Sequence, residues 1–185
     1  MLNLVSSGKN VPEECNVVIE IPAHSAPVKY EVDKASGTLF VDRFINSCMR
    51  YPCDYGYIPQ TLGEDGDPLD ALVVSPFPLI NGSVISVRPI GILKMTDESG
   101  RDIKLLTVPS NAISPLYQSV LKPEDLLPLQ LKEIEFFFRH YKMLEVDKWV
   151  SIEGWGNLQE AYKEIKLGVQ RFIKKGVKPP QSSGE

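Results

Sequence analysis

The stretch Val28-Lys29-Tyr30-Glu31-Val32-Asp33 alternates strictly between apolar and charged side chains. Because successive side chains on a β-strand point to opposite faces, Lys29, Glu31 and Asp33 share one face and the apolar residues share the other. Such alternation is typical of a strand that has one face on a core and the other in solvent. It predicts that this part of the chain forms a β-sheet.

Further short stretches on both sides of this one contain many β-branched residues and are separated by turn-forming residues. The strands that we expect from them comprise residues 17–21, 38–45, 70–75, 84–93, 101–108 and 148–152. Many short strands with turns between them are typical of a small closed or nearly closed sheet. The larger part of the chain is therefore expected to form a β-barrel-like body.

Two later segments repeat apolar residues at intervals of three and four. The two stripes are Leu127, Leu131, Ile134, Phe138 and Tyr141, and then Leu158, Ala161, Ile165, Val169 and Phe172. This spacing places each set on one face of an α-helix. Asn157, followed by Glu160, resembles a capping box and predicts where the second helix begins. We expect both helices to pack against the outside of the barrel.

The composition is that of one ordinary globular domain. Of the 185 residues, 43% are hydrophobic and 24% are charged, which excludes disorder for the bulk of the chain. Neither an internal repeat nor a linker divides the sequence, so we predict a single domain over residues 1–185. Its ends, residues 1–9 and 178–185, carry little apolar surface and are expected to be loose.

The net charge and the hydropathy of the sequence argue against several classes of binding partner. The net charge of −4 argues against nucleic acid as the main partner, because phosphate backbones select clustered Lys and Arg. No apolar run approaches the roughly 18 residues of a membrane span, and the N-terminus lacks the pattern of a secretory signal. Cys15, Cys48 and Cys53 lack metal-ligand spacing and are interpreted as free thiols in a reducing cytoplasm.

The most unusual segment is Glu64-Asp65-Gly66-Asp67-Pro68-Leu69-Asp70, which holds four carboxylates in seven residues. Like charges packed this closely cost free energy unless solvent or a cation relieves them. Gly66 permits a tight turn and Pro68 fixes φ, and carboxylate oxygens on a rigid turn suit Mg²⁺ or a similar ion. The alternative is an acidic surface turn at the start of a strand.

A second acidic group, Asp97-Glu98-Ser99-Gly100-Arg101-Asp102, precedes Ile103 and Lys104. It predicts a hairpin turn that enters a strand on which Asp102 and Lys104 share a face. A two-metal site needs carboxylates from separate segments, so two acidic turns favour such a site. A solvated hairpin is the alternative.

Cationic residues lie on four separate segments, as Lys29, Arg43, Lys104 and Lys142. Phosphate binding needs such groups, although each alone is typical of a solvated surface residue. Three tyrosines within residues 50–59 supply hydroxyls that can donate to an anion, with aromatic core packing as the alternative. The glycine-rich phosphate loops of ATP- and NAD-binding proteins do not occur in the sequence.

The segment Asp65–Asp70 resembles the signature of the soluble family I inorganic pyrophosphatases of the bacterial type. The resemblance extends in the family's order from about residue 10 to 175, through Glu20, Lys29-Tyr30-Glu31, Arg43, Tyr51-Pro52, Tyr55-Gly56-Tyr57, Lys94-Met95-Thr96-Asp97-Glu98, Asp102, Lys104, His140-Tyr141-Lys142 and Glu153-Gly154-Trp155. Arg101, inside the second acidic turn, is a residue that the family pattern does not lead us to expect. If the Arg101 side chain pointed inward, it would weaken metal binding in this turn, and we expect the side chain to point outward.

The resemblance implies a mainly β (α+β) fold, a five-stranded OB-like barrel with flanking helices. It also implies hydrolysis of pyrophosphate to two phosphates by metal-activated water, with several Mg²⁺ ions in the active site. Two metals that share a water lower its pKa toward neutrality. The metal ligands implied are Asp65, Asp70, Asp97 and Asp102, with Glu20, Glu31 and Glu98 acting through water. Asp67 is implied to take the proton, and the residues implied to hold the phosphoryl groups are Lys29, Arg43, Tyr55, Lys104, Tyr141 and Lys142.

Two other functions compete with this interpretation. A non-catalytic OB-type module for nucleotides or single strands would present a basic groove with exposed aromatic residues, whereas this chain is acidic. The second competing function is that of a phosphohydrolase that acts on larger organic phosphates.

Three consecutive phenylalanines bear on the oligomeric state. On a helix, Phe136, Phe137 and Phe138 point about 100° apart and cannot all face one core. At least one is expected to meet another helix or another subunit. With the resemblance to bacterial relatives, which are typically hexamers, this predicts a homohexamer.

Overall fold

The computed structural model describes residues 4–33 and 35–176. These residues form eight strands and two α-helices. In chain order they are β1 (Cys15–Ile21), β2 (Val28–Val32), β3 (Leu39–Phe44), β4 (Asp54–Ile58), β5 (Leu69–Val73), β6 (Val84–Asp97), β7 (Gly100–Pro109), α1 (Pro128–His140), β8 (Val150–Gly156) and α2 (Leu158–Lys174). Short 3-10 turns, η2 (Pro115–Tyr117) and η3 (Pro123–Asp125), precede α1. Every strand and both helices expected from the sequence are present, and β4 is an additional strand.

Five of the strands close into a barrel. The order in the main sheet is β1-β4-β5-β7-β6-β8, and a further pairing of β1 with β6 closes the first five of these strands into a ring, with β8 paired to β6 outside it. The long strand β6 makes this possible because its first residues, Val84–Val87, pair with β1, whereas its last residues, 92–97, pair with β8. The predicted mainly β, five-stranded barrel with flanking helices is confirmed.

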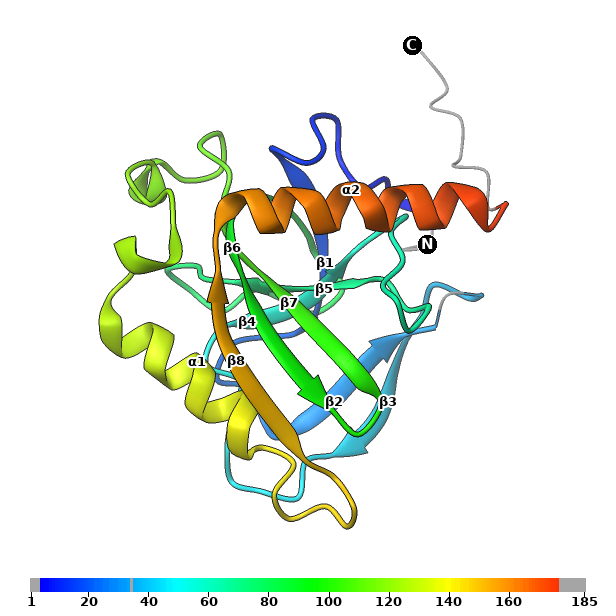
Figure 1. The fold of residues 1–185 in the computed structure, drawn as a ribbon, viewed down its shortest axis with the longest axis vertical. Coiled ribbons are helices and arrows are strands. Elements are labelled where there is room, and N and C mark those ends of the chain that lie inside the picture. The colour runs from blue at the N-terminus through cyan, green and yellow to red at the C-terminus, as the bar shows by residue number, and fades with distance from the viewer. Residues whose placement is uncertain (1–3, 34, 177–185) are drawn as a thin grey trace.

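The remaining elements lie around this barrel. Figure 1 shows α2 crossing one end of the strands and α1 running beside β8, with β2 and β3 forming a separate hairpin. The core of the barrel continues under both helices: Phe137 and Phe138 of α1 and Ala161 and Ile165 of α2 are buried. Burial of each large apolar side chain stabilises the fold by about 1.5–3 kcal/mol. Phe136, by contrast, is 60% exposed.

Strand β4 was not predicted from the sequence, and all five of its residues are buried. Its flanking prolines, Pro52 and Pro59, and its glycine are typical of loops. Gly56 is required here, because a Cβ at this position would overlap the carbonyl oxygen of Val18 on β1. The missing side chain lets β4 lie against β1 and complete the barrel.

The start of α2 matches its prediction. Asn157 accepts a hydrogen bond from the backbone N of Glu160 at 3.1 Å, and Glu160 Oε2 accepts one from the backbone N of Asn157 at 2.9 Å. Of the two ends predicted to be loose, residues 1–3 and 178–185 lie outside the described residues. Within residues 4–9, the carbonyl oxygen of Ser7 accepts a hydrogen bond from the backbone N of Asn16 at 2.8 Å. Among the helices described, none is long and apolar enough to cross a bilayer.

Candidate active site

One cavity of about 410 Å³ gathers every site residue predicted from the sequence. Its lining includes Glu20 from β1, Lys29 and Glu31 from β2, Arg43 from β3, Tyr55 from β4, Asp65, Asp67 and Asp70 from residues 64–70 (the acidic segment), Asp97, Glu98, Asp102 and Lys104 from β6, β7 and their turn, and Tyr141 and Lys142 after α1. These residues come from segments more than 120 positions apart in the sequence. The barrel and α1 bring them together.

The acidic segment is a rigid turn. Gly66 has φ of +89°, and the backbone N of Gly63 donates to the carbonyl oxygen of Asp67 at 2.7 Å. Asp65 Oδ1 accepts from the backbone N of Asp67 at 3.0 Å. The hydroxyl of Thr61, 1% exposed, accepts from the backbone N of Leu69 at 3.0 Å. This confirms the predicted tight turn, which begins β5 and presents Asp65 and Asp67 at the surface of the cavity.

Lys104 joins the two acidic groups. Strands β5 and β7 run parallel with Asp70 beside Lys104, and Lys104 Nζ donates to the carboxylates of Asp70 and of Asp102, the latter at 2.7 Å. Burial by itself would lower the pKa of this lysine, but the two carboxylates outweigh burial and hold the pKa well above its ordinary value. The ammonium is therefore charged at neutral pH, although only 5% of the residue is exposed.

Lys142 has the same relation to the β6–β7 turn. Its Nζ donates to Asp97 at 2.6 Å and to Glu98 at 3.4 Å, and Lys148 donates to Glu98 at 2.6 Å. Burial raises the pKa of Glu98, but hydrogen bonds from Lys148 and from the backbone, with the charge of Lys142, bring it down to about 2. Glu98 is ionised at any physiological pH.

The other walls combine cations with hydroxyl groups. Lys29 pairs with Glu31, and Arg43 Nη1 lies 2.8 Å from Asp42. Burial raises the pKa values of the Tyr55 and Tyr141 hydroxyls. Both tyrosines therefore remain protonated and can donate hydrogen bonds to an anion.

The lining also contains polar and charged residues to which the sequence assigned no role, namely Tyr51, Tyr57, Ser99, Arg101 and Lys148. Tyr57 lies two residues from Tyr55 on β4 and so on the same face, a signal that becomes usable only once this segment is known to be a strand. Lys148 has none, because only the path of the chain after α1 brings it to Glu98.

The donor set fits a hard divalent cation. The cavity lining contains eight carboxylates and neither histidine nor cysteine, and such cations prefer oxygen ligands. Asp70 and Asp102 already meet at one positive charge, that of Lys104. Within residues 4–33 and 35–176, no group of three or more acidic, histidine or cysteine side chains has the close spacing of a preformed metal site.

The balance of charges separates the competing functions. The same cavity that holds the eight carboxylates is also lined by six cations, Lys29, Arg43, Arg101, Lys104, Lys142 and Lys148. A groove for single-stranded nucleic acid is predominantly basic and carries exposed aromatic rings for stacking. The mixed lining instead suits a small polyanion that binds together with cations.

Comparisons with known proteins agree with this geometry. The family model described as inorganic pyrophosphatase matches residues 17–173. An inorganic pyrophosphatase from Ralstonia nicotianae is 55% identical over 172 residues, 93% of this chain and 98% of the relative. One from Salmonella typhimurium is 53% identical over 171 residues, 92% of this chain and 97% of the relative.

Solved structures give the same result. The crystal structure of an inorganic phosphatase from Anaplasma phagocytophilum superimposes with a TM-score of 0.90 at 46% identity, covering 91% of this chain and 99% of that one. The inorganic pyrophosphatase of Thermus thermophilus gives a TM-score of 0.88 at 38% identity, covering 93% and 98%. A five-stranded barrel with this charged cavity and these relatives is a hydrolase of phosphorus-containing anhydrides. More narrowly, the chain belongs to the inorganic pyrophosphatase family, in its bacterial type.

Proposed function

We propose that this chain hydrolyses inorganic pyrophosphate to two phosphates in the presence of Mg²⁺. The observation that carries the proposal is that eight carboxylates and six cations line the same cavity of about 410 Å³. Pyrophosphate is small and highly charged, so its hydrolysis depends on neutralising charge and positioning groups more than on covalent catalysis.

The carboxylates are assigned to the metal. Asp65, Asp70, Asp97 and Asp102 would hold Mg²⁺ directly, and Glu20, Glu31 and Glu98 would do so through water. When bound, the ions supply positive charge for the phosphate oxygens and make water more acidic. The pairing of Asp70 and Asp102 with Lys104 supports this assignment, because it shows that both side chains converge on one cation.

The remaining residues are assigned to substrate and proton. Lys29, Arg43, Tyr55, Lys104, Tyr141 and Lys142 would bind the two phosphoryl groups. Lys104 and Lys142 are suited to this because both have raised pKa values and stay charged while largely buried. Asp67 would accept the proton of the attacking water as general base, since it faces the cavity from an exposed turn.

The test is phosphate release from pyrophosphate, ATP and a simple phosphate monoester, each with Mg²⁺ and with excess chelator. We expect release from pyrophosphate to exceed release from the other two, and to vanish in chelator. Preferential turnover of ATP or the monoester would favour a phosphohydrolase for larger organic phosphates. Full activity in chelator would contradict the metal assignment.

We further propose a cytoplasmic homohexamer. The exposed Phe136 supports the oligomer, because it lies with His24, Met49, Leu129 and Phe137 along a largely apolar groove of about 470 Å³ beside α1. The three cysteines, all unpaired, support a reducing compartment.

A further inference from the structure

One face of α2 is docked onto the acidic segment. The carbonyl oxygen of Gly168 accepts a hydrogen bond from the backbone N of Leu62 at 3.0 Å. A Cβ on Gly168 would lie 2.6 Å from Leu69 Cδ1. The close approach therefore depends on a glycine in the middle of the helix, where glycine otherwise costs about 1 kcal/mol in helix propensity.

Glu164 and Arg171 lie on the same face, four residues before Gly168 and three after it. Arg171 Nη1 donates to Glu164 Oε1 at 2.9 Å and to the carbonyl oxygen of Leu62 at 3.2 Å. Arg171 Nη2 lies 3.5 Å from Glu64 Oε1. The helix thus contacts the backbone of Leu62, just before the acidic segment, and the side chains of Glu64 and Leu69 within it.

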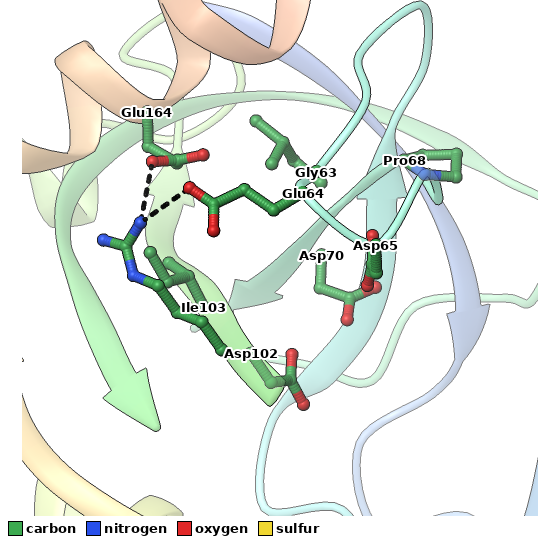
Figure 2. A pocket seen from close by; sticks show the side chains of 10 residues that line it. Gly63, Glu64, Asp65, Pro68, Asp70, Asp102, Ile103 and Glu164 are labelled. Atoms are coloured by element: carbon green, nitrogen blue, oxygen red, sulfur yellow. Dashed lines mark hydrogen bonds and ion pairs between the residues drawn. The ribbon is translucent and has the colours of Figure 1, made fainter. Parts of the chain in front are cut away.

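Arg101 connects this contact to the second acidic turn. Its Nη1 lies 3.3 Å from Glu64 Oε1 and 3.9 Å from Glu164 Oε2, the two pairs marked by dashed lines in Figure 2. In the same view, Glu64 and Glu164 lie on one side, and Asp70 and Asp102 lie on the other. The two arginines and two glutamates close a ring of alternating charge that links β7, residues 62–64 and α2.

Within this ring of charges, Glu164 contributes most to the stabilisation. The side chains of Arg101 and Glu64 are 49% and 54% exposed, and ion pairs between such exposed groups contribute little. Only 8% of the Glu164 side chain is exposed. A buried carboxylate costs free energy unless charged partners surround it. The folded state is therefore most stable when both arginines stay beside Glu164, which holds them in place.

We propose that Arg101, Glu164 and Arg171 are positioning residues, which hold the acidic segment so that Asp65, Asp67 and Asp70 face the cavity. The proposal rests on the proposed function, because it assigns these three carboxylates to Mg²⁺ and to the proton. It also accounts for Arg101, the unexpected cation of the second acidic turn, whose partners are Glu64 and Glu164.

Positioning and simple charge predict opposite results at Arg101. If the arginine acted only as a nearby positive charge, its removal would favour a bound cation, and Mg²⁺ would bind more tightly. If it positions the acidic segment, its removal disorders the carboxylates, and Mg²⁺ binds more weakly. Loss of a group that orients metal ligands typically weakens metal binding by about 10-fold or more.

The experiment measures Mg²⁺ binding by calorimetry in the absence of substrate, for the wild type, Arg101→Gln, Arg171→Gln and Glu164→Gln. Lys166→Gln, an exposed cation on the same helix, is the matched control. We expect a dissociation constant about 10-fold higher in each ring variant and no change in the control. Arg101→Lys, which keeps the charge, should recover part of the affinity. Affinity that is unchanged or tighter in Arg101→Gln and Arg171→Gln overturns the proposal, even if Glu164→Gln fails to fold.

Amide hydrogen exchange over residues 62–70 separates this proposal from the proposed function, because it requires neither metal nor turnover. Faster exchange in the ring variants than in Lys166→Gln is expected, and equal exchange overturns the positioning role. A wild-type protein that binds no Mg²⁺ and releases no phosphate from pyrophosphate overturns the proposed function alone.

Discussion

Asp67 differs from its neighbours in the role assigned to it. Asp67→Asn keeps the size of the side chain but cannot accept a proton, so turnover should fall by roughly 10²–10⁴-fold. Mg²⁺ binding should change little. Asp65→Asn and Asp70→Asn each remove a ligand charge and should raise the Mg²⁺ concentration needed for half-maximal activity.

The measurement is an Mg²⁺ titration of activity for the three variants at two pH values. Residual turnover of Asp67→Asn should increase at the higher pH, where hydroxide forms without a base. If added Mg²⁺ alone restores this variant, Asp67 is a ligand and the base lies elsewhere.

Cys15 provides a pH-dependent contribution to stability. It is 1% exposed, and burial, with the charges of Glu13 and Glu14, raises its pKa to about 12. An unfolded thiol has a pKa of about 8.5, so between these values the unfolded chain has lost a proton that the folded chain retains. The contribution is complete below about pH 8.5 and is lost as the pH rises, by about 1.4 kcal/mol per pH unit.

Denaturant unfolding at several pH values from about 8 to 11 checks this dependence. Cys15→Ala should make the decline less steep without abolishing it, because burial also raises the pKa of the Cys53 thiol, whereas Cys48→Ala, at an exposed thiol, should leave it as in the wild type. An identical slope in all three proteins would contradict the assignment.

At the level of elements, the first turn of α2 is held by a reciprocal pair of hydrogen bonds between Asn157 and Glu160. Asn157→Ala removes one partner and should lower the free energy of unfolding by about 1 kcal/mol. Asn157→Asp retains the acceptor and should stay near the wild type. Thermal and denaturant unfolding measure both, and equal loss in the two variants would show that the cap is not the cause.

Whether a strand or helix could be predicted from the sequence depended on how its polar and apolar residues are arranged. The strand over 28–32 and the helix over 158–174 follow from their periodicity, because each has one polar and one apolar face. Strand β4 is buried along its whole length, and its flanking prolines and its glycine are loop signals that the packing of Gly56 against Val18 overrides. Only its pairing with the neighbouring strand β1 in the folded protein shows that this segment is a strand.

At the level of the whole molecule, the exposed Phe136 predicts assembly. Light scattering at micromolar concentration should give the mass of a hexamer. Phe136→Glu places a charge on the apolar groove beside α1 and should shift the protein toward smaller species, whereas Phe136→Leu should not. A stable wild-type monomer would contradict the proposed assembly.

Local sequence by itself determined the strands with two distinct faces, both helices, the cap of α2 and the rigid acidic turn, because these depend on residues at most a few positions apart. The order of its motifs also indicated the family. Tertiary structure alone decided that Asp70, Asp102 and Lys104 meet, that Arg101 pairs with Glu64 and Glu164, and that Lys148 reaches Glu98. Such contacts join segments that lie far apart in the sequence, and they form only when closure of the barrel and docking of α2 outweigh the entropy of bringing the segments together.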